Sequence, residues 1–597
     1  MGCHGVHVPG HTACLAHLAD ADRDAYLADL APGAAIDHRG TPFTELLLNA
    51  LLDALLDPAT GHPRIGEARF EAATFQGDAR FLRATFQSNA WFDSATFQGL
   101  AWFDSALFQG LARFESASFQ GLAHFNSASF QGYAGFRSAT FHDLAWFDSA
   151  TFHGITKFAS ATFENRAQFA SATFQEAAFE RAVFQGTGQF RAATFAGHAS
   201  FGWTTFKGAA QFQAAVFEGD AGFGEATFER SVTLGPLACA GRFVLSEATF
   251  SGPANLSLTA RRLQCSRTRW SSTAELRLRY ATVDFAHAVF EYPLTIAAEA
   301  DPFVLPDGQL VDEQILADAP DATVRVASLR GVDAAHLLLA DVDLSRCLFA
   351  GTVHLDQVRL EGACVFDGVP SGTHRRRRRP IRFTQRRTLA EEHCWRASRA
   401  TAVRGWNVAV FGAGQVGPAQ LAPVYRALRK AFEDGKNEPG AADFYYGEME
   451  MRRHDHTGTA RAERGLLHSY WLLSGYGLRA SRALGWLAAA MLVTIVLLMG
   501  LGLPRADPRQ EATGTVPPGG GKVTFEIDKA DPQNPTRNRF TGERLEKALN
   551  VTLNSVVFRS SEQDLTTAGT YIEMASRVTE PVLLGLAVLA VRNRVKR

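Results

Sequence analysis

Phenylalanines recur along residues 70–228 at alternating spacings of five and six residues. In AWFDSATFQGLAWFDSALFQGLARF they stand at positions 92, 97, 103, 108 and 114. Neither a helix, which needs apolar residues three or four apart, nor one long strand, which needs an even spacing, gives this pattern a single apolar face. Most of these phenylalanines follow a small residue two positions earlier, as Ala95 precedes Phe97. Residues i and i+2 share a face of extended chain, so each Ala-x-Phe unit is predicted to be a short side with two inward side chains.

Four such sides would make a coil of 22 residues and place Phe75 and Phe97 in one interior column. Backbone hydrogen bonds would stack the coils about 4.8 Å apart. The glycines of the recurring FQG suit the corners between sides. The pattern therefore predicts an all-β solenoid over residues 61–368, which is stabilised by stacking of neighbour on neighbour. From Phe174 to Phe184 the gaps become five and five, which predicts a local change of register.

The Ala-x-Phe units resemble the pentapeptide-repeat family, and the usual leucine form of that repeat follows in SLRGVDAAHLLLADVDLSRCLFAGTVHLDQVRLEG, residues 328–362. The resemblance implies a right-handed quadrilateral β-helix. In this register Cys347 and Cys364 take the small inward position, so they are predicted to be interior filler rather than nucleophiles. Residues 293–325 break the repeat and are predicted to be an insertion or a broadened coil.

The outward positions of the repeat vary, and Trp91, Trp102 and Trp146 are candidates for a binding surface. They do not form a continuous ladder, so the pattern does not favour nucleic acid as a partner. Some members of the family imitate DNA in shape and charge, but the acidic excess here is too small to match a phosphate backbone. The formal net charge of the whole chain is −1. The sequence thus favours a rigid scaffold with a mixed surface that binds an unknown cytoplasmic protein.

Residues 1–60 precede the repeat and are predicted to form its N-terminal cap, with a leucine-rich helix that closes the first coil. The start, MGCHGVHVPGHTACLAHL, carries a cluster of cysteines and histidines. Its CLAH element, Cys14 and His17, resembles half of a small zinc knuckle, with Cys3 as the third ligand and histidine 7 or 11 as the fourth. The alternative is an ordinary cap with solvated histidines. No other cofactor is expected.

The cysteine count and the N-terminus both indicate a reducing compartment. The chain has 7 cysteines, an odd number, and no CxxC pair. This composition argues against a disulfide framework. The first residues also lack the charged-then-apolar design of a signal peptide, so the front of the chain is predicted to stay in the cytoplasm.

Residues 369–480 are predicted to be a basic linker followed by a helical hairpin. The arginine run at 375–379 is either solvated or in contact with anionic lipid headgroups. VAVFGAGQVG carries Gly412, Gly414 and Gly417 in the spacing of a dinucleotide fingerprint. The following sequence offers no second buried strand, so we interpret the motif as a decoy. Similar actinobacterial repeat proteins are labelled membrane-associated oxidoreductases, but no redox motif supports that activity here, and the chain is predicted not to be an enzyme.

Two apolar stretches predict membrane spans at 481–503 and 571–591. Basic residues precede the first span and form the tail at 592–597, which places both termini in the cytoplasm. The loop at 504–570 would then be extracytoplasmic, with an amphipathic segment at 543–558. This arrangement predicts a multi-pass protein of a bacterial inner membrane.

The second span carries three charged residues, Glu573, Arg577 and Glu580, on one helix face. Charges that face lipid are costly, so this face is predicted to line an oligomer interface or a polar path. The order of span, short helix, Thr/Gly segment and span resembles two-span ion channels, although DLTTAGTY lacks the GYG carbonyl ladder. The functional hypotheses are a non-enzymatic membrane-anchored scaffold, an oligomeric channel-like or signalling protein, and, with the least support, an oxidoreductase.

Overall fold

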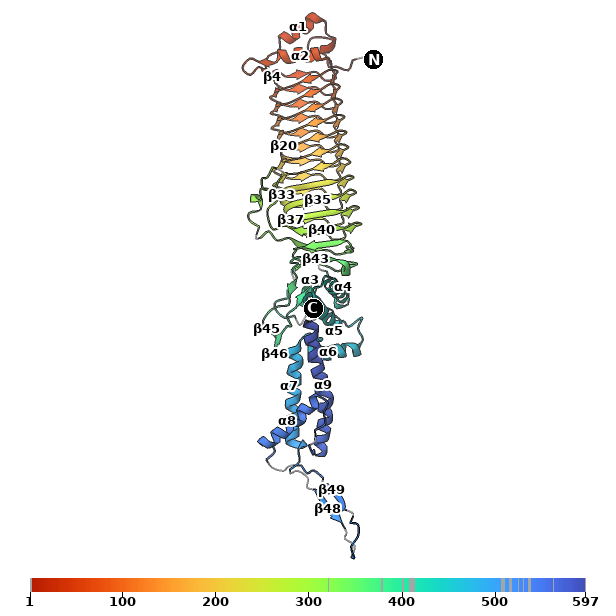
Figure 1. Ribbon diagram of the computed structural model, residues 1–597. Coiled ribbons are helices and arrows are strands. Elements are labelled where there is room, and N and C mark those ends of the chain that lie inside the picture. Colours follow the sequence, from red (N-terminus) through yellow and green to blue (C-terminus); the bar gives the residue numbers. More distant parts are fainter. Residues whose placement is uncertain are drawn as a thin grey trace. The chain divides into compact units, whose positions relative to one another are not determined.

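The computed structural model describes residues 3–595 except 306, 320, 377–378, 400–401, 407–413, 506–509, 515–517, 524, 530, 535–537 and 562. The chain divides into two compact units, Met1–Val416 and Gly417–Arg597. Coils of short strands make up most of the first unit, and helices make up most of the second (Figure 1).

One coil shows how the repeat builds the first unit. Its four sides contain the two-residue strands β5 (Ala68–Arg69), β6 (Thr74–Phe75), β7 (Ala79–Arg80) and β8 (Thr85–Phe86). In each side an alanine and a phenylalanine are buried, and the residue between them is partly or fully exposed. The predicted solenoid is confirmed. Its coils run over residues 36–366, a segment called the rod below.

Successive coils pair in parallel and in register, so that Phe97 lies between Phe75 and Phe119. One side of the rod forms a twelve-stranded sheet. Its strands are β2 (Pro42–Phe43), β6, β10 (Thr96–Phe97), β14 (Ser118–Phe119), β18 (Thr140–Phe141), β21 (Thr162–Phe163), β24 (Val183–Phe184), β28 (Thr205–Phe206), β32 (Thr227–Phe228), β34 (Thr249–Phe250), β36 (Arg269–Trp270) and β39 (Val289–Phe290).

The phenylalanine rings fill the interior of the rod in two geometries. Within a column they stack face to face, and the centroids of Phe97 and Phe119 lie 4.7 Å apart with 1° between the ring planes. Between columns they meet edge to face, as Phe92 and Phe103 do at 5.6 Å and 83°. Edge-to-face contact places the positive ring edge against a negative ring face, which adds to the gain from burial.

The corners are of two kinds, and the glycines are not needed for the reason the sequence suggested. The shorter corners contain a residue in the left-handed conformation, such as Ser94 and Ser105, both at φ +56°. The longer corners contain glycines such as Gly99, which does not adopt a positive φ. A Cβ at Gly99 would lie 2.6 Å from the backbone carbon of Gly77 in the preceding coil. Close approach between coils therefore requires the glycine.

The irregular spacing after Phe174 corresponds to one shortened coil. β20 (Thr151–Lys157) pairs with β23 (Thr173–Ala178), and the register shifts between Phe152 and Ile155. Phe158 nevertheless stacks on Phe179 at 4.9 Å. The missing corner residue is absorbed without a break in the phenylalanine columns.

The later coils are built from longer strands, β33 (Val232–Val244), β35 (Ala254–Gln264), β37 (Ala274–Arg279) and β40 (Leu294–Ala298). The column continues where Trp270 stacks on Phe250 at 4.0 Å. The predicted insertion lies between β40 and β41 (Arg325–Ser328). The buried Arg279 anchors it through its Nε, which donates to Glu313 Oε1 at 2.6 Å.

Helices cover the start of the rod. α1 spans Asp20–Ala28, and α2 spans Glu45–Ala54 within the first coil. Thr44 caps α2, because its Oγ1 accepts a hydrogen bond from the backbone N–H of Leu47 at 3.3 Å. The leucines of α2 that are spaced at three and four residues, Leu48, Leu51 and Leu52, are buried. An amphipathic helix thus covers apolar surface that an open coil would expose.

Another helix, α3 (Ala390–Ala397), satisfies backbone groups near the other end of the rod. The buried Glu391 Oε1 accepts the N–H groups of Phe349 at 2.5 Å and Ala350 at 3.0 Å. Burial raises the pKa of Glu391. These amides have no further coil to pair with, and the carboxyl group takes the place of the missing carbonyls.

In the second unit the helices are α4 (Pro418–Asp434), α5 (Glu438–His454), α6 (Arg461–Ser474), α7 (Ala480–Leu497), α8 (Gly542–Val556) and α9 (Thr567–Val595). α7 continues as a π-helical turn, Leu498–Gly502. Strands β48 (Gln510–Gly514) and β49 (Phe525–Lys529) pair as an antiparallel hairpin. Two helical stretches, Ala480–Gly502 and Thr567–Arg592, are long and apolar enough to cross a membrane.

The arginine run falls on a short hairpin in the first unit. The backbones of β45 (Thr373–Arg376) and β46 (Arg379–Arg382) pair antiparallel. Residues 377–378 lie outside the described part of the chain, as do the side chains of residues 375–382. The two hypotheses for this run, solvation and lipid contact, stay predictions.

The first coil generates a prediction about pH, because His38 stands where the repeat would place a phenylalanine. Its backbone N–H donates to Arg69 O at 2.8 Å, and its ring meets Phe43 edge to face at 5.8 Å. Burial lowers the pKa of His38 from 6.5 to about 4. Between pH 6.5 and pH 4, the unfolded chain therefore binds a proton at His38 that the folded chain does not bind. The coil should lose about 3 kcal/mol of stability as the pH falls from 6.5 to 4.

The substitution His38→Phe should remove this pH dependence, because it restores the column residue and takes away the proton site. Hydrogen exchange of residues 36–43, corrected for the intrinsic pH dependence of exchange, measures the effect. His153→Phe on the exposed surface is the matched control and should leave the wild-type dependence unchanged. Equal pH dependence in wild type and His38→Phe would contradict the assignment.

Candidate functional site

The N-terminal cap brings the three predicted metal ligands together. Cys3, Cys14 and His17 each offer one ligand atom, and these atoms all lie within 4.8 Å of one another. The Sγ atoms of Cys3 and Cys14 are 3.4 Å apart, and Cys14 Sγ lies 3.1 Å from His17 Nδ1. Two sulfurs and an imidazole nitrogen are a donor set that zinc prefers.

Local backbone structure explains the geometry. Cys14 precedes a short 3₁₀ turn, Leu15–His17, in which the N–H of His17 donates to Cys14 O at 2.9 Å. This turn brings the side chains of Cys14 and His17 to one side. Cys3 lies on the extended first segment of the chain. This segment is held against the first coil by the Val6 N–H, which donates to Arg39 O at 2.8 Å.

The two sulfurs differ in exposure and in hydrogen bonding. Cys14 is buried, and burial raises the pKa of its thiol, to which the neighbouring Cys3 adds. The backbone N–H groups of Ala16 and His17 act in the opposite direction, because they favour the thiolate. Cys3 is exposed, and its Sγ accepts the N–H of Gly5 at 3.3 Å. Each sulfur therefore already has a backbone donor that would stabilise negative charge on it.

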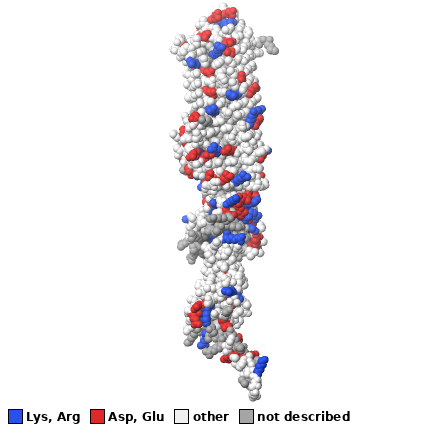
Figure 2. Space-filling model, in the orientation of Figure 1, with Lys and Arg blue, Asp and Glu red and all other residues white. Residues whose placement is uncertain are grey.

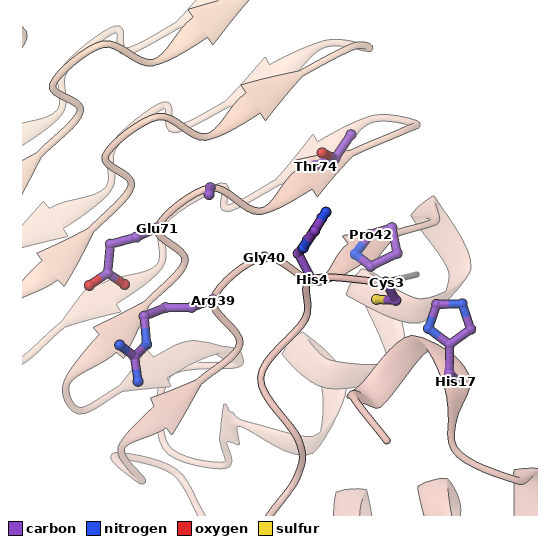
Figure 3. Close-up of a pocket in the computed structure, with 9 residues that line it drawn as sticks. Cys3, His4, His17, Arg39, Gly40, Pro42, Glu71 and Thr74 are labelled. Carbon is purple, nitrogen blue, oxygen red and sulfur yellow. The ribbon is translucent and has the colours of Figure 1, made fainter. Parts of the chain in front are cut away.

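An open pocket of about 720 Å³ adjoins the cluster. Figure 3 shows Cys3, His4 and His17 on one side of it and Arg39 and Glu71 on another. The histidines predicted as the fourth ligand are not part of the cluster. His7 is exposed, and His11 Nδ1 lies 3.9 Å from Asp22 Oδ2.

The predicted surface tryptophans pack along the rod. Trp102 stacks on His124 at 4.0 Å, and His124 meets the ring of Trp146 edge to face at 4.4 Å. Trp91 lies under the guanidinium of Arg113, 5.0 Å from its carbon. All three tryptophans are half-buried. They form two short outward clusters rather than one ladder, and their role in binding stays a prediction.

Trp203 is more exposed than these three tryptophans, and the sequence analysis did not single it out. Half of it, 50%, is exposed. Its Nε1 donates to Glu225 Oε2 at 2.7 Å, and Arg181 lies 5.4 Å from its ring. It occupies a corner at φ +57°, and not a side. A tryptophan at a corner position that most often holds serine was the signal that could have identified it.

Charged residues of both signs are distributed along the rod. Figure 2 shows lysine and arginine interspersed with aspartate and glutamate on the visible face. Ion pairs between neighbouring coils, such as Arg242 with Asp220 at 2.7 Å, neutralise many of them. The visible face is thus a mixed surface, with no large area of one sign.

The three charged residues of the second span make different contacts. Near the start of α9, Glu573 Oε1 accepts Ser561 N–H at 3.1 Å and Arg577 Nη2 at 3.1 Å. Glu580 is fully buried inside the second unit, and Thr494 Oγ1 of α7 lies 2.9 Å from its Oε1. Glu580 Oε2 has no hydrogen-bond partner among the described residues. Whether this face also serves an oligomer or a polar path stays a prediction.

The glycine motif lies at the edge of the described region. Gly412 is outside it, Gly414 adopts φ +65°, and Gly417 precedes α4. α4 leads directly into helix α5 rather than into a strand. A dinucleotide site needs a second parallel strand after this helix, so the order of elements here does not favour one.

The interior cysteines of the rod are poor nucleophiles. Cys239, Cys265 and Cys347 are buried. Burial raises the pKa of Cys239 to about 12 and raises the pKa values of Cys265 and Cys347 as well. A protonated thiol enclosed in the apolar interior of the rod is out of reach of a substrate.

Comparison with known proteins identifies one family. The family described as "Pentapeptide repeats (9 copies)" matches residues 92–140, 114–162 and 136–182. No curated protein and no solved structure shows significant similarity to the chain.

Proposed function

Since residues 92–182 are pentapeptide repeats, we propose that the chain is a non-enzymatic scaffold that is anchored in a membrane and binds a protein partner through its rod. A bacterial inner membrane, with the rod in the cytoplasm, is the proposed location. The observation that carries the membrane part of the proposal is the apolar, unburied surface of α7 and α9.

Both helices expose large apolar side chains along their length. In the apolar windows of the two stretches, only 22% and 28% of the residues are buried inside the unit. A core helix of a water-soluble domain would be mostly buried. The exposed residues of α7 and its π-helical turn include Leu484, Leu492, Val493, Val496, Leu497 and Leu501, and those of α9 include Tyr571, Met574, Val578, Val582, Val588, Leu589 and Val591. Hydrocarbon is the solvent that such a surface fits.

Basic residues at the helix ends support the orientation. Arg479 and Arg482 stand at the start of α7, and Arg482 lies 5.2 Å from the ring of Trp471. Arg592 lies near the C-terminal end of α9. Positive charges favour the cytoplasmic side, so both chain ends are proposed to face the cytoplasm and the segment between α7 and α9 the outside.

The rod supports binding rather than catalysis. Its interior is occupied by alanine and phenylalanine, and its corners and outward positions are held by hydrogen bonds from coil to coil. Such a surface is rigid, so binding a partner costs little free energy for ordering the side chains and loops of the rod. The half-exposed Trp203 and the Trp102–His124–Trp146 cluster are the proposed contact points, since tryptophan is enriched in binding hot spots.

A second candidate function, an ion-channel-like module, is favoured by the position of α8. Ser576 Oγ of α9 donates to Ser555 Oγ of α8 at 3.0 Å. At the other end of α8, Arg544 donates to the carbonyl oxygens of Met499 and Leu503 at 2.8 and 2.9 Å. A short helix thus contacts both apolar helices, and this contact supports the second candidate.

The substitution Leu492→Arg tests the membrane anchor. Leu492 is 63% exposed near the middle of the first span, and an arginine there opposes insertion by about 3 kcal/mol. We expect the variant to shift from the alkali-resistant membrane pellet to the soluble or degraded fraction. Leu82→Arg, at a leucine of the rod that is 48% exposed, is the matched control and should fractionate as wild type. Recovery of the wild-type chain in the soluble fraction would contradict the proposal.

Site-specific photo-crosslinking in cells tests the scaffold. A photoreactive amino acid at Trp203 or Trp102 should give a discrete adduct that mass spectrometry identifies as one other protein. The same group at Leu492 reports the membrane background. If neither tryptophan position gives an adduct above that background, protein binding through this surface is wrong.

Reconstitution of the full chain in liposomes tests the second candidate. A channel-like module should conduct ions, and Glu580→Ala, which removes the buried carboxyl group between α7 and α9, should change the flux. Glu526→Ala, an exposed acid on β49, is the control and should conduct as wild type. Absence of flux under all ionic conditions would exclude the channel-like function.

A further inference from the structure

We propose that Cys3, Cys14 and His17 bind one Zn²⁺ ion, and that this ion fastens the N-terminal segment, residues 3–18, over the first coil of the rod. The inference goes beyond the scaffold proposal and does not depend on it. It assigns a metal to the cap and gives that metal a mechanical role.

The distances in the cluster fit a tetrahedral zinc site. With Zn–S bonds of about 2.3 Å, two thiolates on one tetrahedral ion lie about 3.7 Å apart. The sulfurs of Cys3 and Cys14 lie 3.4 Å apart. His17 Nδ1 lies 3.1 Å from Cys14 Sγ, and all three ligand atoms lie within 4.8 Å of one another. The two sulfurs would need to separate by only a few tenths of an ångström to reach the S–S distance of a tetrahedral ion.

Contacts within the chain already hold the ligand atoms near one another. Gly5 N–H donates to Cys3 Sγ at 3.3 Å, and Cys14 Sγ contacts Cys3 Sγ and His17 Nδ1. Such donors around the ligands hold them in place and strengthen metal binding. Without an ion, one of the two thiols donates a hydrogen bond to the other sulfur, and zinc would take the place of that proton.

The fourth position faces the pocket and is open to solvent. His7 is exposed away from the cluster, and His11 lies beside Asp22. His4 lines the pocket, but it is not among the residues whose ligand atoms converge. We therefore assign three protein ligands and a water molecule to the ion.

The ion would join the two halves of the N-terminal segment where the segment crosses the first coil. Val6 N–H pairs with Arg39 O, and a Cβ at Gly40 would lie 2.6 Å from His4 O. A Cβ at Gly5 would likewise meet the Cβ of Cys14 at 2.6 Å. The segment thus lies directly on coil residues and on its own second half. Cys3, on the first half, and Cys14 and His17, on the second, are the residues that the ion cross-links.

The fastening matters because the first coil has no coil before it. The N-terminal segment supplies backbone contacts at that end, and an uncovered strand edge can pair with another chain. Loss of the ion should therefore loosen residues 3–8 and expose residues 36–43.

The experiment uses the full chain, purified in detergent without chelator. Elemental analysis should find about one zinc per chain, and Co²⁺ in its place should give the visible bands of a tetrahedral thiolate complex. Cys3→Ser and His17→Ala should lose the metal. Both side chains are exposed, so these variants keep the packing of the cap. Cys364→Ser and His4→Ala are the controls and should retain the metal.

Hydrogen exchange tests the mechanical role. Chelation should speed exchange in residues 3–8 and 36–43 of the wild type, and added zinc should reverse it. Cys3→Ser should exchange fast with or without zinc. Wild-type chain without zinc, zinc retained in Cys3→Ser and His17→Ala, or a Cys3–Cys14 disulfide in the purified chain would overturn the site. Loss of metal from His4→Ala would overturn the open fourth position, and unchanged exchange after chelation would overturn the fastening role.

Discussion

Face-to-face stacking of phenylalanine between coils is the interaction on which the rod depends. The ring spacing of 4.7 Å between Phe97 and Phe119 is also the spacing at which neighbouring strands form hydrogen bonds. One repeat distance therefore satisfies the backbone and the side chains together. From residue 68 to residue 228 each coil presents phenylalanine rings to the next, so stability accumulates by nearest-neighbour contacts. The interior is then filled with apolar rings and has no room for chemistry.

In this solenoid, several residues that depart from the repeat and carry polar or ionisable groups lie at its two ends. At the start of the rod, His38 replaces a phenylalanine and the cysteine–histidine cluster lies beside the first coil. Near the other end, Glu391 supplies the acceptors that a further coil would have supplied. These positions share one cause, because a stacked array always leaves two coils with one neighbour. At one of these positions, Glu391, a side chain makes the backbone hydrogen bonds that a neighbouring coil would have made.

The sequence predicts the interior of the rod well, because its period is local. The Ala-x-Phe unit determines which side chains point inward. The column through Phe97 follows from the spacing of 22 residues between equivalent phenylalanines. The corners were predicted less well: serines such as Ser94 adopt the left-handed conformation, and Gly99 is needed for close approach between coils. The contacts of Glu391 with Phe349 join residues that are distant in sequence, and no local pattern predicts such pairs. The proposed ligands Cys14 and His17 could be suggested from the sequence because they share one turn.

The rod buries its apolar side chains, whereas α7 and α9 of the second unit expose theirs. In the rod, alanine and phenylalanine are inside and polar residues outside, which suits water. Along α7 and α9 leucine and valine are outside, whereas Thr494 and Glu580 meet in the interior. In the orientation of Figure 1, the part of Figure 2 that corresponds to the middle of these helices is almost free of charged residues. The two patterns suit two different solvents, water for the rod and the hydrocarbon of the proposed membrane for α7 and α9. The inversion of pattern after residue 480 is therefore a stronger argument for a membrane than the length of either helix.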